Sequence, residues 1–241
     1  MIFQLDGENV DRSTFEIDSN GRLDAYNGSL NPQKVVDIPS NVRKIGEYVF
    51  YERNEIETIN IPSIVTKIEN HAFYRCTSIK HISLPQSLTY LSGFSRCSAL
   101  ESIDIPPLVT EIGNEAFSEC YSLTSLVLPS SVIKIGEGAF RNCENLTSIV
   151  IPEGVEEIGE YAFYGCSKLT SLTLPTTLKK VGSAAFSNCA NLEVINKNHL
   201  IENIEGGILT NSPLLKNFGE FIIENGFFIK NGILYSFSGN E

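Results

Sequence analysis

The sequence predicts an α/β repeat solenoid, in which short units stack their strands into a parallel β-sheet on one face. Apolar residues precede a recurring proline at fixed distances, and most units continue with the pattern Ala-Phe-x-x-Cys. The intervals between successive prolines are 23, 23, 21, 23, 23 and 23 residues: Pro39, Pro62, Pro85, Pro106, Pro129, Pro152 and Pro175. We expect seven clear units and one degenerate unit over residues 33–215, with β-rich caps at 1–32 and 216–241.

The composition is that of a folded chain with an acidic surface. Hydrophobic residues make up 42% of the 241 and are spaced rather than clustered, so disorder is not expected. No apolar run approaches the roughly 18 residues of a membrane helix, and no signal peptide is visible at the start. The net charge of −11, without a Lys/Arg stripe, argues against nucleic-acid binding. We therefore expect no nucleic-acid partner and no direct membrane insertion.

Residues 1–32 precede the repeat and predict a small β-structure. The segment 14–26 alternates apolar and polar residues around Asn20-Gly21, a pair that favours a tight hairpin turn. Such a hairpin would cover the apolar core that an open array exposes at its first unit.

Each unit then predicts one short strand that ends at proline. Apolar residues lie three and one positions before it, as at Leu126 and Leu128, and this period of two buries one face. Proline cannot donate to a β-ladder and therefore ends the strand. Glycine recurs seven positions after proline and predicts a bend, although Glu69 and Ser92 at this position show that a positive φ is not required.

The Ala-Phe-x-x-Cys segment predicts a single helical turn with Phe and Cys on one side. The third unit is two residues short before Phe94. The cysteines occupy one position in successive units: Cys76, Cys97, Cys120, Cys143, Cys166 and Cys189. Stacking places their Cβ atoms about 4.8 Å apart, outside the usual ~3.5–4.5 Å of a disulfide. We predict a reduced ladder of buried thiols. Disulfides or a metal site are the alternatives, but a linear file does not converge on a metal, and we expect no cofactor.

After Cys189 the pattern weakens but keeps its register. Apolar residues hold the expected offsets from Leu192 to Leu215, with Asn198 at the proline position, and this predicts the eighth unit. Residues 218–238 contain Asn-Gly pairs between apolar runs and predict short antiparallel strands in a C-terminal cap.

The unit L-x-x-I-x-I-P-x-x-V-x-x-I-G-x-x-A-F-x-x-C resembles the leucine-rich repeat of BspA-type surface proteins. In the fourth unit the match rests on Ile103, Ile105-Pro106, Gly113, Ala116-Phe117 and Cys120. The resemblance extends over roughly 20–238. It implies a right-handed solenoid and an exposed recognition role, extracellular or at a cell surface, and it supplies no catalytic residues.

The outward strand positions, four and two residues before each proline position, are the candidate binding surface. We predict that eight of them face a partner: Asp37, Asn60, His81, Ser83, Asp104, Ser125, Thr173 and Asn196. A second candidate patch is formed by tyrosines around the Phe turns: Tyr51, Tyr74, Tyr121 and Tyr164.

No motif for catalysis is present, and none of His71, His81 and His199 belongs to a recognisable catalytic set. We expect a non-enzymatic recognition or adhesion module for a protein or glycan, monomeric rather than oligomeric. A structural spacer within a larger surface protein and an intracellular interaction scaffold are the alternatives.

Overall fold

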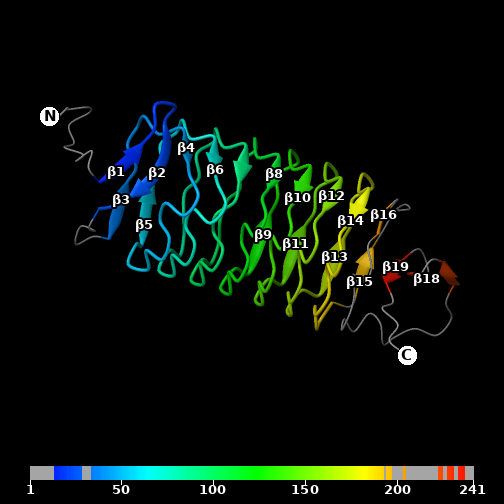
Figure 1. Ribbon diagram of the computed structural model, residues 1–241. Helices are drawn as coiled ribbons and strands as arrows, with labels where there is room; N and C mark the ends of the chain where they lie inside the picture. Colours follow the sequence, from blue (N-terminus) through cyan, green and yellow to red (C-terminus); the bar gives the residue numbers. More distant parts are fainter. Residues whose placement is uncertain are drawn as a thin grey trace.

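The computed structural model describes residues 14–28, 34–192, 194–196, 203–204, 222–224, 227–230 and 233–236. These residues form an elongated stack of coils, each of which is one repeat unit, numbered here from the coil that contains Pro39 (Figure 1). Within these ranges the chain forms strands and turns and no helix. The fold is therefore a β-solenoid with parallel strands, and the prediction of helical turns was wrong.

The strand predicted before proline is present in six coils. It forms β3 (Val35–Asp37), β5 (Thr58–Asn60), β9 (Ser125–Val127), β11 (Ser148–Val150), β13 (Ser171–Thr173) and β15 (Val194–Asn196). These strands pair in parallel as β3–β5, β9–β11 and β13–β15. Coils 3 and 4 form no strand at this position, and β11 and β13 belong to different sheets, so the predicted continuous sheet is divided into separate pairs.

A second strand, which the sequence did not reveal, follows the proline of coils 1 to 7 and the equivalent Asn198 of coil 8. It forms β4 (Lys44–Ile45), β6 (Lys67–Ile68), β7 (Tyr90–Leu91), β8 (Glu111–Ile112), β10 (Lys134–Ile135), β12 (Glu157–Ile158), β14 (Lys180–Val181) and β16 (Asn203–Ile204). Together with β1 (Phe15–Ile17) and β2 (Arg22–Tyr26), these strands make a ten-stranded sheet. Two residues are too few to show an alternating pattern, which is why only the buried residue of each strand was evident.

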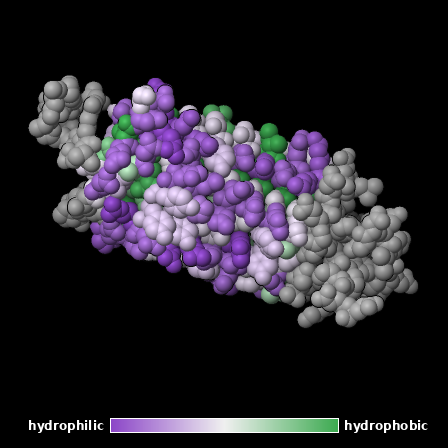
Figure 2. All heavy atoms as spheres, in the orientation of Figure 1, coloured by the Kyte–Doolittle hydropathy of each residue, from purple (hydrophilic) through white to green (hydrophobic). Residues whose placement is uncertain are grey.

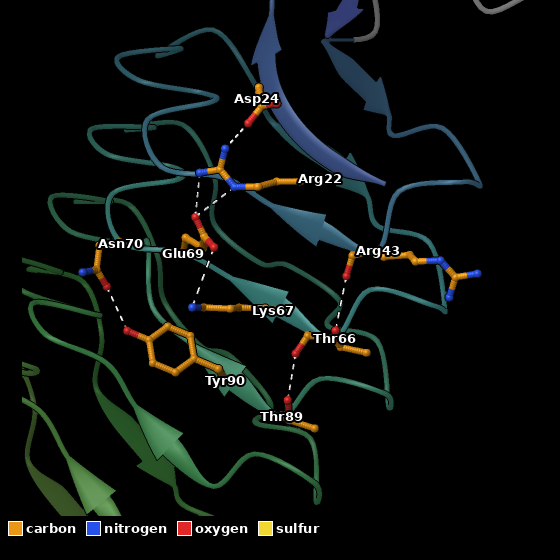
Figure 3. A network of polar contacts seen from close by, with 9 residues as sticks. All are labelled: Arg22, Asp24, Arg43, Thr66, Lys67, Glu69, Asn70, Thr89 and Tyr90. Atoms are coloured by element: carbon orange, nitrogen blue, oxygen red, sulfur yellow. Dashed lines mark hydrogen bonds and ion pairs between the residues drawn. The ribbon is translucent and has the colours of Figure 1, made fainter. Parts of the chain in front are cut away.

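The N-terminal hairpin joins the solenoid through β2. Strands β1 and β2 pair antiparallel around a turn in which Gly21 has a φ of +79°, and β2 pairs in parallel with β4. Figure 3 shows a second link, in which Arg22 of β2 reaches past the first coil to Glu69 in the second, with Nη2 2.8 Å from Oε2. Glu69 also pairs with Lys67 at 3.7 Å, and Arg22 with Asp24. The β2–β4 pairing thus joins the cap to coil 1, and the ion pairs join it to coil 2.

At the other end, β17 (Ile222–Glu224), β18 (Phe227–Lys230) and β19 (Ile233–Ser236) form a three-stranded antiparallel sheet. The two predicted Asn-Gly turns, His199 and most of the eighth unit lie outside the described residues.

The Ala-Phe-x-x-Cys segment is a turn because the residue before alanine and the residue before cysteine both adopt a left-handed backbone conformation. In coil 4, Glu115 and Glu119 have φ values of 50° and 58°, which no right-handed helical turn contains. Alternate backbone N–H groups instead donate to the next coil, as from Phe117 to the carbonyl of Ala139 at 2.7 Å. The turn segments thus form a third column of backbone hydrogen bonds between coils, in addition to the two sets of strands, but without regular strand geometry.

The interior is filled by ladders of identical residues. In each of coils 1 to 7 one phenylalanine is fully buried, and successive rings stack with centroids 5.0–5.7 Å apart: Phe50, Phe73, Phe94, Phe117, Phe140, Phe163 and Phe186. Burial of apolar area on this scale is the main stabilising contribution, and no coil achieves it alone.

The recurring glycine after the second strand permits close stacking. A Cβ on Gly159 would lie 2.5 Å from the backbone nitrogen of Glu137 in the preceding coil, and one on Gly182 would lie 2.4 Å from that of Glu160. Neither glycine has a positive φ. The glycine is therefore selected by the spacing between coils, rather than by a bend.

Candidate recognition surfaces

The outward positions of the first strands form one surface, which we call the strand face. Seven of the eight predicted partner-binding residues have exposed side chains there: Asp37, Asn60, His81, Ser83, Asp104, Ser125 and Thr173. The backbone of Asn196 pairs with Thr173 between β15 and β13. His81, Ser83 and Asp104 belong to coils 3 and 4 and lie outside regular strands.

Several polar side chains of the strand face contact each other along the stack. Asn60 donates from Nδ2 to Oδ1 of Asp37 at 2.6 Å, and His81 Nδ1 lies 3.0 Å from Ser102 Oγ. The strand face thus presents linked polar groups rather than a pocket.

Two valines interrupt this polar surface. Val127 and Val150 are directly paired on β9 and β11, and their side chains are 73% and 67% exposed, the largest values among the exposed large hydrophobic residues described. Both valines lie two residues before a proline, so the repeat pattern predicts that they face outward, but it assigns them no role. The alternation Ser-Leu-Val at 125–127 and Ser-Ile-Val at 148–150 is the signal that identifies both outward valines.

The turn segments form a second surface. The face of the molecule drawn in Figure 2 is largely hydrophilic. Tyr51 and Tyr74 stack with centroids 5.2 Å apart, and Tyr48 stacks on His71 at 5.1 Å. The guanidinium of Arg96 lies over Tyr74 at 5.6 Å. Of the four tyrosines suggested by the sequence, Tyr51 and Tyr74 lie together around coils 1 and 2, beside cationic and imidazole groups, whereas Tyr121 and Tyr164 belong to coils 4 and 6.

The short third coil creates a depression in this surface, which we call the notch. Gly93 occupies the place of Ala72 and Ala116 in the backbone ladder, and the two residues that precede alanine elsewhere are missing. The resulting hollow has a volume of about 410 Å³. Its walls include His71, Tyr74, Ser95, Arg96, Glu115, Ser118, Glu119 and Arg141.

Charged groups in the notch are largely paired with each other. His71 Nε2 lies 3.2 Å from Oε2 of Glu115, and Arg96 Nη2 lies 3.1 Å from Oε1 of Glu119. Arg141 has no ion-pair partner among the described residues, and its guanidinium lies 5.7 Å from the centroid of Tyr164. These pairs hold the walls in a defined arrangement.

The six cysteines lie in the core and not on either surface. All six are free thiols with no exposed area. Each Sγ donates to the carbonyl of the phenylalanine one coil earlier, as from Cys143 to Phe117 at 3.0 Å. Burial raises the pKa of the Cys143 thiol to about 12, and the same cause raises the pKa of the other five. A thiol that stays protonated is a poor nucleophile and a poor metal ligand.

The described ranges hold neither a metal-binding cluster nor a membrane-spanning helix. They contain no cluster of three or more His, Cys, Asp or Glu side chains able to hold a metal ion. They also contain no helix long and apolar enough to cross a membrane.

The sequence and the fold are similar to those of known leucine-rich repeat proteins. The sequence profile of the BspA type leucine rich repeat region (6 copies) matches residues 24–143 and 110–234. A crystal structure of a Treponema pallidum leucine rich repeat protein is 31% identical, with a TM-score of 0.68, over 77% of this chain and 91% of that one. A leucine-rich repeat protein from Bacteroides ovatus is 26% identical, with a TM-score of 0.62, over 82% and 67% of the respective chains. No curated protein matches the sequence. The repeat, its stacked coils and these matches establish that the chain belongs to the BspA-type leucine-rich repeat family.

Proposed function

We propose that this chain is a non-enzymatic recognition module that binds a protein partner through the strand face. The observation that carries the proposal is the exposed pair Val127 and Val150. The contact between the two valines across neighbouring strands contributes only about 0.2–1 kcal/mol to the sheet, whereas an apolar centre inside a polar surround is the usual anatomy of an interface.

The surroundings of the valines fit this role. Ser125 and Thr173 lie on the same or neighbouring strands and are exposed, so a partner would meet small hydroxyl groups beside the apolar centre. Farther along the stack, Asp37, Asn60 and Asp104 offer hydrogen-bonding groups. Small side chains allow a partner's backbone to approach closely, and an apolar centre favours a protein partner over a glycan on this face.

We further propose an extracellular or cell-surface location and a role in adhesion. The support is the resemblance of the repeat to BspA-type surface proteins together with membership of that family. Labelling of intact cells with a membrane-impermeant reagent tests the location: the native protein should be labelled before lysis, and labelling only after lysis would contradict it.

The binding proposal is tested with substitutions at the valine pair. The chain is immobilised and screened against purified extracellular proteins by interferometry, and each protein that binds is then measured with Val127→Asp/Val150→Asp. We expect binding to weaken at least about tenfold, since each buried valine contributes roughly 1.5 kcal/mol or more. Ile133→Asp is the matched control, because Ile133 is 50% exposed but lies beyond the strand face. Equal weakening by both variants, or none by either, would refute the proposal.

A further inference from the structure

The notch contains buried polar groups that the fold itself does not use. Ser95 and Ser118 are 2% and 4% exposed and line the hollow. Within the described residues, neither hydroxyl makes a hydrogen bond to the protein, whereas the buried Ser92 donates to the carbonyl of Asn114 at 3.0 Å. An unsatisfied buried hydroxyl costs roughly 1–3 kcal/mol. Two of them at the base of one hollow therefore indicate a ligand that supplies their partners.

The two serines also shape the hollow. They occupy the position two residues before cysteine, where the preceding coils carry Tyr51 and Tyr74 and the following coil carries Arg141. Ser95 lies in coil 3, which is two residues short, and Ser118 lies in coil 4 beside it. The small side chains and the missing residues therefore enlarge the same space. Its volume of about 410 Å³ falls within the range of roughly 300–1,000 Å³ that is typical of small-ligand sites.

The charges around the notch restrict the chemistry of the ligand. Arg96 and Arg141 contribute two positive charges, and Glu115 and Glu119 contribute two negative charges, which sum to zero when His71 is neutral. An anionic ligand would meet two carboxylates, and a cationic ligand would meet two guanidinium groups. A neutral ligand with many hydroxyl groups can use both the donors and the acceptors.

Aromatic rings complete the site. The rings of Tyr48 and Tyr51 border the notch and are about half exposed, at 51% and 46%. Tyrosine combines an apolar ring with a hydroxyl group, which suits a ligand that has both C–H and O–H surfaces. From these observations we infer that the notch is a binding site for a neutral saccharide unit, whose hydroxyl groups complete the hydrogen bonding of Ser95 and Ser118.

This site is separate from the strand face, since it is built from the turn segments of coils 1 to 5. Either site can therefore fail without the other. The saccharide site adds a second kind of ligand to the protein partner proposed above.

The test begins with an array of immobilised neutral, sialylated and sulfated oligosaccharides. We expect the native chain to bind neutral oligosaccharides and to retain this binding in Val127→Asp/Val150→Asp. Calorimetric titration with the strongest neutral oligosaccharide then compares the native chain with Ser95→Ala/Ser118→Ala. We expect an affinity loss of about tenfold or more, from two missing hydrogen bonds.

A stability measurement separates ligand binding from a structural role. Removing two unsatisfied hydroxyls should leave the melting temperature unchanged or raise it, and Ser187→Ala, the same position in coil 7, should leave saccharide binding unchanged. The inference is overturned if no neutral oligosaccharide binds, if sialylated or sulfated ones bind more tightly, if only proteins bind at the notch, or if the double alanine variant binds as the native chain does.

Discussion

His71 Nε2 lies 3.2 Å from a carboxylate oxygen of Glu115, although the two residues are 44 positions apart and belong to coils 2 and 4. Most other side-chain contacts along the stack join neighbouring coils. This contact skips a coil because coil 3 has lost the two residues that would separate the partners. One shortened repeat thus converts a regular surface into the notch.

The origin of the notch can be tested by restoring the length of coil 3. Insertion of Asn-Glu between Ser92 and Gly93, combined with Gly93→Ala, gives this coil the 23-residue spacing of its neighbours. We expect a folded protein, because Ala72 and Ala116 are fully buried at the same position in the adjacent coils. A crystal structure should show the hollow filled and His71 separated from Glu115. A hollow of unchanged volume would contradict this explanation.

The thiol ladder predicts a loss of stability at alkaline pH. An unfolded cysteine has a pKa of about 8.5, whereas burial raises the pKa of Cys76 to about 12. The folded thiol keeps its proton to a higher pH than the unfolded thiol does. The stabilisation that it contributes is therefore fully present below about pH 8.5 and is lost as the pH rises toward 12. Each thiol should lower the free energy of unfolding by about 1.4 kcal/mol per pH unit in this interval.

Urea unfolding under reducing conditions at pH 8, 9 and 10 measures this dependence. Partly buried tyrosines such as Tyr90, whose pKa burial also raises, act in the same direction, so a matched variant is needed. Cys120→Ala should reduce the slope of the free energy of unfolding against pH by the contribution of one thiol. An unchanged slope, or rapid reaction of the native protein with a thiol reagent, would rule out the protonated ladder.

The phenylalanine stack should be most sensitive at its centre. Phe117 is fully buried between the rings of Phe94 and Phe140, at 5.7 and 5.5 Å, and its replacement by alanine leaves a cavity bordered by two coils. We expect Phe117→Ala to lower the free energy of unfolding by about 3–5 kcal/mol. The exposed Tyr121, when changed to alanine, should cost less than about 1 kcal/mol. Denaturant unfolding of both variants provides the comparison, and similar losses would contradict it.

Substitutions at two glycines separate the effect of the spacing between coils from the effect of backbone conformation. Gly159→Ala places a Cβ 2.5 Å from a backbone nitrogen of the preceding coil, so the coils must separate. Gly138 has a φ of +57°, but an added Cβ meets nothing closer than 3.5 Å, and Ala184 adopts a φ of 53° at the equivalent position. We expect Gly159→Ala to lower the melting temperature by more than Gly138→Ala does, since the left-handed alanine costs only about 1–2 kcal/mol. A larger loss of melting temperature in Gly138→Ala than in Gly159→Ala would show that backbone conformation matters more than the spacing between coils.

The sequence predicted the repeat, the buried positions and the first strand well, because proline and alternating apolar residues mark them directly. It did not predict the second strand, since a pair such as Lys134-Ile135 is too short to show a period. It predicted a helical turn where Glu115 and Glu119 adopt positive φ values, and nothing in those residue types signals the left-handed region. The shortened coil was evident, but its consequence was not. The notch depends on contacts between coils, such as His71 with Glu115, which one unit viewed alone does not contain.

The most direct test of the proposed function maps which surface touches the protein partner. A photo-reactive amino acid is placed at position 150 on the strand face, at position 133 beyond it, or at position 74 beside the notch, and each chain is irradiated with the bound partner. We expect efficient cross-linking from position 150 and little from positions 133 and 74. Cross-linking concentrated at position 74, or equal at all three positions, would contradict it.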